Sequence, residues 1–133
     1  MKRLRLMYFL LLLISKFSYS QNPEKLTFQD FKEGVFEAKY GDKIYIIERD
    51  NNFQLEKIVG FKGYIKYNIK WFNDKKYVLT YNSSTLSDKK LNEKYSQMKD
   101  SILVELTKIH DNYCHFRAIL KGQEFFDSIK KVN

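Results

Sequence analysis

The chain has 133 residues, of which 44% are hydrophobic, 17% aromatic and 30% charged, and its formal net charge is +8 at pH 7. This length fits one domain with a single modest core rather than two domains. The chain has only one cysteine, which excludes an internal disulfide, so its stability must come from apolar burial.

The first twenty residues have the pattern of a secretory signal peptide. Basic residues precede an apolar run at positions 6–14, which is too short to span a bilayer, and small residues predict cleavage between Ser20 and Gln21. We therefore expect a mature domain of residues 21–133 in the periplasm or outside the cell, without stable membrane insertion after cleavage. The leader holds four basic and no acidic residues, so the mature chain carries only +4. This modest charge does not favour a nucleic-acid partner.

Alternation of apolar and polar residues dominates the mature chain and predicts strands. A short helical turn comes first, because Thr27 and Asp30 match a capping pattern and Gly34 follows. The predicted strands cover residues 35–40, 43–49 and 53–59, a central hairpin over 64–81 that residues 82–84 end, and then 102–109, 113–120 and 124–132. Gly41 and Asp42 form a two-residue loop that suits a type II′ hairpin turn.

One helix interrupts the strands, at about residues 86–98, before the sixth strand. Its apolar residues are spaced five, four and three apart, which fits one helical face. They are Leu86, Leu91, Tyr95 and Met98. Thr85 and Asp88 match a capping box for this helix. A helix of this length is marginal alone in water, so we expect it to dock on the sheet.

Short connections place sequential strands side by side, so the predicted fold is mainly β: an eight-stranded antiparallel meander. Eight strands are enough to form a small closed or half-open barrel, whose interior is either filled by side chains or holds one small ligand. The alternative is an open, strongly curved sheet with the helix lying across it.

Few residues have the spacing that catalysis or metal binding requires. His110, Cys114 and His115 are the only cluster of metal-ligand types, but neighbouring residues of a strand point to opposite faces, so Cys114 and His115 cannot share an ion. The serines stand beside no histidine, and phosphate-binding glycine loops are absent. We therefore expect no metal, no cofactor, no catalytic residue and a non-enzymatic function, with Cys114 as a buried apolar residue.

Aromatic residues are unusually dense, with ten tyrosines, eleven phenylalanines and one tryptophan. Tyrosine combines apolar area with a hydroxyl, which suits ligand pockets, although aromatic residues also populate ordinary strands. As a hypothesis, the ligand-binding residues are those on shared faces of the central hairpin: Tyr67, Trp71, Tyr77 and Tyr81.

Several short motifs resemble a set of small exported proteins of Bacteroidota bacteria, some of which carry a DNA topoisomerase IV label. The motifs are Phe31-Lys32-x-Gly34-x-Phe36, Ile46-Ile47-Glu48-Arg49-Asp50, Ile69-Lys70-Trp71, Tyr77-x-Leu79-Thr80-Tyr81 and Ile129-Lys130-Lys131. The resemblance covers most of the mature chain and implies no catalytic residue. A small exported domain without a nucleotide-binding loop does not fit a topoisomerase.

Two functions remain as expectations. The first is a non-catalytic binding module for a small amphiphile, a glycan or an envelope component, and it requires a cavity of at least about 300 Å³ lined by several tyrosines. The second is a structural or protein-interaction component of the cell envelope, for which a filled interior is expected.

Overall fold

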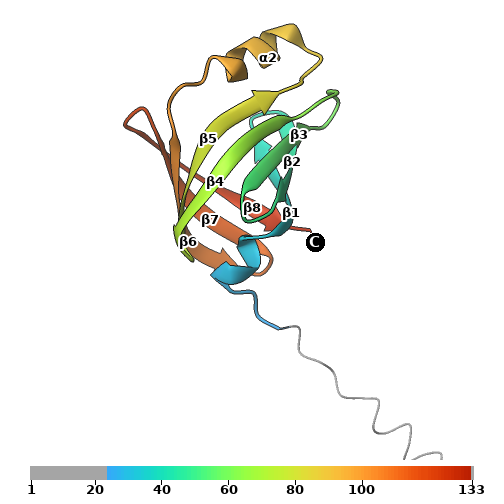
Figure 1. The fold of residues 1–133 in the computed structure, drawn as a ribbon. Coiled ribbons are helices and arrows are strands. Elements are labelled where there is room, and N and C mark those ends of the chain that lie inside the picture. The colour runs from blue at the N-terminus through green and yellow to red at the C-terminus, as the bar shows by residue number, and fades with distance from the viewer. Residues whose placement is uncertain (1–23, 133) are drawn as a thin grey trace, which may run out of the picture.

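The computed structural model describes residues 24–132, which form a closed antiparallel β-barrel of eight strands (Figure 1). The strands are β1 (Gly34–Tyr40), β2 (Lys43–Arg49), β3 (Phe53–Ile58), β4 (Ile65–Asn73), β5 (Lys76–Ser84), β6 (Ile102–His110), β7 (Tyr113–Leu120) and β8 (Gln123–Lys131). Each strand pairs with the next along the chain, and β8 pairs with β1. This confirms the predicted meander and selects the closed barrel over the open sheet. The predicted leader and its cleavage site at Ser20 and Gln21 lie outside the described residues.

The tight turn between β1 and β2 fixes the register of these two strands, and the turn at Asp50 fixes that of β2 and β3. Gly41 has a φ of 62° and Asp42 does not have a positive φ, as expected for the predicted type II′ turn. From this turn, Gly34 pairs with Arg49 across β1 and β2, and Arg49 in turn pairs with Gln54 on β3. Side chains paired across strands share a face, so Arg49 and Gln54 point to the same side of the sheet.

A short 3-10 helix, η2 (Phe28–Phe31), lies at one end of the barrel (Figure 1). The backbone N–H of Thr27 donates to the carboxylate of Asp30 at 2.7 Å, which confirms the predicted cap. Phe31 is fully buried and stacks on Phe36 with ring centroids 5.7 Å apart. Lys131 of β8 donates to the carbonyl oxygen of Asp30 at 2.8 Å, so the last strand also holds this turn in place.

The apolar core consists of inward side chains from all eight strands together with η2. Its largest fully buried members come from both ends of the chain and meet inside the barrel. They are Phe31, Phe36, Ile47, Ile58, Ile65, Leu106, Cys114 and Ile129. The predicted burial of Cys114 is therefore confirmed. None of the helices within residues 24–132 is long and apolar enough to cross a membrane.

The helix α2 (Lys89–Ser96) lies over the end of the barrel opposite η2, rather than on the outside of the sheet (Figure 1). It is shorter than the predicted 86–98, and the expected capping box at Thr85 is wrong. Asp88 is the N-cap, and its carboxylate accepts from the backbone N–H of Leu91 at 3.0 Å. Thr85 instead continues the pairing of the central hairpin, because its N–H donates to the carbonyl oxygen of Tyr64 at 2.9 Å.

The loop before β4 is clamped against the segment that leads into α2. Ser87 donates its backbone N–H to the carbonyl oxygen of Lys62 at 3.0 Å. Between these contacts, Gly63 has a φ of 95°, and a Cβ atom there would overlap the carbonyl oxygen of Thr85. Glycine is therefore required at this position by both its backbone conformation and the lack of space.

Candidate functional site

The interior of the barrel contains a cavity of about 590 Å³, lined by inward side chains from all eight strands. Five tyrosines contribute to its wall: Tyr40, Tyr45, Tyr67, Tyr77 and Tyr95. The remaining wall is mostly aliphatic and aromatic. This volume exceeds the lower limit expected for a small-molecule site, and its mixture of apolar area with a few polar groups is typical of such sites.

A buried arginine forms the floor of this cavity. Arg49 is only 5% exposed, and its guanidinium makes three hydrogen bonds. It donates from Nε to the side-chain oxygen of Gln54 at 2.8 Å, from Nη1 to the carbonyl oxygen of Phe31 at 2.7 Å, and from Nη2 to the hydroxyl of Tyr77 at 2.9 Å. The rings of Phe36 and Tyr77 lie 5.1 and 4.8 Å from its central carbon. Arg49 therefore ties the η2 turn to β2, β3 and β5.

The polar chain continues from Arg49 up the wall of the cavity. Gln54, which is 2% exposed, donates from Nε2 to Oε1 of Glu56 at 2.8 Å. Glu56 is 9% exposed, and burial raises the pKa of its carboxyl group, although the hydrogen bond from Gln54 and the charge of Arg49 oppose this. The interior thus contains a cation and a carboxyl group that are separated by an amide rather than in direct contact.

Several tyrosines line the cavity together with Glu56. Burial raises the pKa of Tyr40, Tyr67 and Tyr95, and the nearby charge of Glu56 adds to each of these shifts. These hydroxyls are therefore neutral at physiological pH and act as hydrogen-bonding groups. The hydroxyls of Tyr95 and Tyr45 lie 3.0 Å apart, so α2 is joined to β2 over the cavity.

The cavity reaches the solvent beside the seam between β1 and β8. Only two residue pairs join these strands, Phe36 with Lys131 and Glu37 with Lys130, and both lie toward the η2 end. Beyond them the cavity is lined by Tyr40 on one side of the seam and by the first half of β8 on the other. Phe126 in that half is 71% exposed. The seam therefore provides an aromatic opening to the interior.

The structure brings together two of the four residues that the sequence suggested as ligand-binding. Tyr67 and Tyr77 line the cavity, whereas Trp71 and Tyr81 do not belong to its wall. Trp71 lies farther toward η2, where its ring packs 4.4 Å from that of Tyr77 and beneath the ammonium of Lys32 at 5.1 Å. Its indole nitrogen is buried without a hydrogen-bond partner among the described residues. Tyr81 lies nearer α2, and its hydroxyl is hydrogen-bonded to Ser84 at 2.8 Å.

Arg49, Gln54 and Glu56 were missed by the sequence reasoning. In β3, apolarity alone would turn Phe53 and Leu55 inward, but the structure turns Gln54 and Glu56 inward instead. The signal that could have located them is the pair of turns that flank β2. Counting from Gly41-Asp42 places Arg49 on the same face as the apolar residues of β1, and the turn at Asp50 then pairs Gln54 with Arg49.

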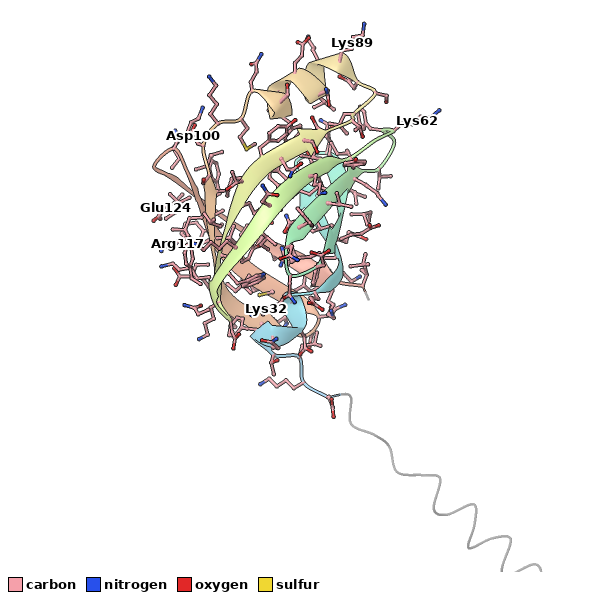
Figure 2. The ribbon with its side chains drawn as sticks, viewed as in Figure 1. Lys32, Lys62, Lys89, Asp100, Arg117 and Glu124 are labelled. Atoms are coloured by element: carbon pink, nitrogen blue, oxygen red, sulfur yellow. The ribbon has the colours of Figure 1, made fainter. Side chains whose placement is uncertain are left out.

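The outer surface differs from the interior because its charged side chains are solvated or paired with each other. Arg117 and Glu124, labelled in Figure 2, are joined at 2.9 Å on the outside of β7 and β8, and Arg117 also reaches Glu105 at 3.0 Å. Lys32 lies at the η2 end and Lys89 at the α2 end (Figure 2). These lysines sit at opposite ends of the barrel rather than in one basic patch.

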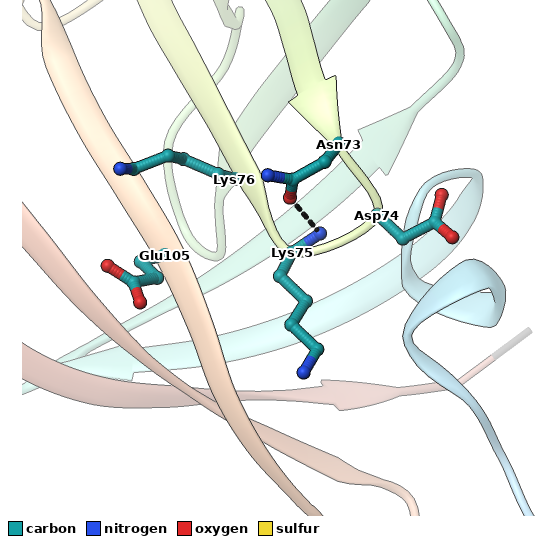
Figure 3. Close-up of a pocket in the computed structure, with 5 residues that line it drawn as sticks. All are labelled: Asn73, Asp74, Lys75, Lys76 and Glu105. Carbon is teal, nitrogen blue, oxygen red and sulfur yellow. Dashed lines mark hydrogen bonds between the residues drawn. The ribbon is translucent and has the colours of Figure 1, made fainter.

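Two further hollows lie on the outside of the barrel, and the lining of the second includes one buried polar residue, Arg49. One, of about 360 Å³, surrounds the turn between β4 and β5, where Lys75 donates its backbone N–H to the side-chain oxygen of Asn73 at 2.8 Å (Figure 3). Glu105 and Lys76 complete its lining with exposed or half-exposed side chains. The other, of about 640 Å³, runs over the outer faces of β1–β4 beside Phe53. Both hollows lie outside the barrel, whereas the cavity walled by the five tyrosines lies within it.

The histidines and the cysteine do not converge. Cys114 points into the core, whereas His115 is exposed on the outer face. Burial raises the pKa of the Cys114 thiol to about 11. Within residues 24–132, no three His, Cys, Asp or Glu side chains are grouped closely enough to hold a metal ion.

Comparison with protein-family models, with curated proteins and with solved structures finds no match.

Proposed function

We propose that this protein is an exported, non-catalytic binding module that holds one small amphiphilic molecule inside its barrel. The observation that carries the proposal is the cavity of about 590 Å³ walled by five tyrosines. A purely structural envelope component with a filled interior, the alternative function, would not need such a space. The apolar walls suit a hydrocarbon or ring system, and the buried hydroxyls and carboxyl group suit a polar end.

The non-catalytic part of the proposal is supported by the chemistry of the wall. The thiol of Cys114 is buried and poorly ionised, so it is a weak nucleophile. Glu56, the one buried carboxyl group within residues 24–132, is hydrogen-bonded to the amide of Gln54, and no histidine lines the cavity to converge with it. General acid–base or nucleophilic catalysis needs such converging groups.

The test is a titration with N-phenyl-1-naphthylamine, an uncharged amphiphilic probe whose fluorescence rises in apolar sites. We expect saturable binding of one probe per chain. Ala118, whose side chain points into the cavity, provides the blocking variant: Ala118→Phe should weaken binding by about tenfold or more, because the added ring occupies the space of the probe. Ile119→Phe is the matched control, since the next residue of the strand faces outward.

The folding of both variants is checked by circular dichroism before binding is compared. Absence of saturable binding to the wild-type protein would overturn the proposal. Equal binding by the folded Ala118→Phe variant would also overturn it, because the probe would then sit outside the barrel.

A further inference from the structure

The positively charged group inside the cavity, the guanidinium of Arg49, is already hydrogen-bonded to other residues of the protein. Arg49 makes three hydrogen bonds to the protein, and aromatic rings lie within about 5 Å of its central carbon. It sits at the floor, where one of its partners is the backbone of the η2 turn. A guanidinium bound in this way has a structural role and offers little to an anionic ligand.

The carboxyl group of Glu56, in contrast to Arg49, has one oxygen without a hydrogen-bond partner among the described residues. Gln54 donates to Oε1, while Oε2 has no hydrogen-bond partner among the described residues, and no lysine or arginine forms an ion pair with Glu56 there. An ionised carboxylate that is buried without a counter-ion is costly. A ligand with a positive charge would supply the missing counter-ion and remove this cost.

Two tyrosines that line the cavity together with Glu56 also have hydroxyls without partners among the described residues. Tyr67 is only 2% exposed and lines the cavity, yet within residues 24–132 its hydroxyl makes no hydrogen bond. Tyr40 likewise lines the cavity with a free hydroxyl, and its ring packs edge-on against Tyr45 at 5.0 Å. Electron-rich rings close to a carboxylate form a favourable site for an organic cation.

We infer that the ligand is an amphiphile with a cationic amine, whose ammonium group binds the free oxygen of Glu56 and the hydroxyl of Tyr67. This inference rests on the proposed function, because it assigns the polar end of the molecule held in the barrel. The apolar part of the ligand extends along the cavity toward the opening beside Phe125. Asp127, which also lines that opening, adds negative charge along the path.

The test compares three probes that share one alkyl chain and differ in charge: decylamine, 1-decanol and sodium decanoate. Each is titrated at pH 7 by displacement of N-phenyl-1-naphthylamine. We expect decylamine to bind about tenfold or more tightly than either of the others, the size of effect that one charge-assisted hydrogen bond provides.

Three variants locate the interaction. Glu56→Gln keeps the shape of the side chain and removes its charge, and it should remove the preference for decylamine over 1-decanol. Tyr67→Phe, which keeps the ring, should reduce the preference by a smaller factor. Glu48→Gln is the matched control, because Glu48 lies on the outer face of β2 and is paired with Lys57 at 2.8 Å.

The outcomes separate the two proposals. If decanoate binds as tightly as decylamine, or if Glu56→Gln retains the preference, the cationic ligand is refuted while the binding module stands. If none of the three probes displaces the fluorescent reporter and the reporter itself does not bind, the proposed function fails as well.

Discussion

Replacing Arg49 tests how the floor of the barrel is held together. Arg49→Met keeps a side chain of similar length but leaves three buried acceptors without their donor: the carbonyl oxygen of Phe31, the amide oxygen of Gln54 and the hydroxyl of Tyr77. Each buried acceptor that is left without its donor costs about 1–3 kcal/mol, so the three together cost at least about 3 kcal/mol. We therefore expect the free energy of unfolding to fall by that amount.

A second substitution divides this loss among the contacts. Tyr77→Phe removes one acceptor and leaves the other two hydrogen bonds of Arg49 intact, so the expected loss is about 1–2 kcal/mol. Because both side chains belong to one network, the double variant should lose little more than Arg49→Met alone.

Urea unfolding followed by far-ultraviolet circular dichroism provides the measurement. Fluorescence of Trp71, the only tryptophan, serves as a second probe, although its ring lies 5.8 Å from the central carbon of Arg49 and will respond locally to the substitution. Arg117→Met is the matched control, since that arginine forms its ion pairs on the outer surface and such pairs contribute little.

The two arginines must behave differently for the reasoning to hold. If Arg49→Met unfolds within about 1 kcal/mol of the wild-type protein, the interior network is not what secures the η2 turn. Equal losses for Arg49→Met and Arg117→Met would likewise refute the assignment of the interior arginine as the structural one.

Three other predictions follow from single positions. Gly63→Ala should lower the free energy of unfolding by more than Gly60→Ala, whose cost of about 1 kcal/mol comes from backbone strain alone; urea unfolding of both variants decides this. Cys114 should react with Ellman's reagent at pH 8 only after denaturation, because burial and a pKa of about 11 keep its thiol protonated; prompt reaction of the folded protein would contradict this. Burial raises the pKa of Glu56 above its ordinary value of 4.5, so the folded state holds this proton more tightly and the contribution of Glu56 to stability falls as pH rises above 4.5. The advantage of Glu56→Gln over wild type in urea unfolding should therefore grow between pH 4 and 8, whereas Glu48→Gln should show no such trend.

Most of the fold could be predicted because local signals agree with the global arrangement. Alternating residues, two-residue turns and short connections all favour a meander, and the structure contains the eight predicted strands in that order. The position of the helix was also predictable from its spacing. Its start was not, because the backbone of Thr85 is engaged by Tyr64 of the neighbouring strand, and capping patterns do not reveal such tertiary competition.

The candidate site was only partly predictable, for two physical reasons. Inward-facing positions along one strand look equivalent in a sequence, yet Tyr67 lies beside the cavity while Trp71, four residues on, packs beside the η2 turn. The depth of a side chain along the barrel axis depends on the tilt of its strand and on the elements that close each end of the barrel. The alternation of apolar and polar residues in the sequence carries no information on either. The second reason is that polar residues at inward positions of β3 run against the usual hydrophobic pattern.

The buried polar residues Arg49, Gln54 and Glu56 could serve either the stability of the barrel or the binding of a ligand. Replacing a complete buried polar network by apolar residues of similar size is often neutral or stabilising, unlike removal of one member. We therefore expect the triple variant Arg49→Met, Gln54→Leu, Glu56→Leu to be more stable than Arg49→Met alone and within about 2 kcal/mol of wild type. Its residual defects are the unpaired carbonyl oxygen of Phe31 and the unpaired hydroxyl of Tyr77. Urea unfolding measures the stability of the triple variant, and decylamine titration measures whether it still prefers the cationic probe. A stable triple variant that has lost its preference for decylamine would mean that these three side chains serve the ligand, because the barrel folds without them. If the triple variant is no more stable than the single one, the network is required for folding and its polar character needs no ligand to explain it.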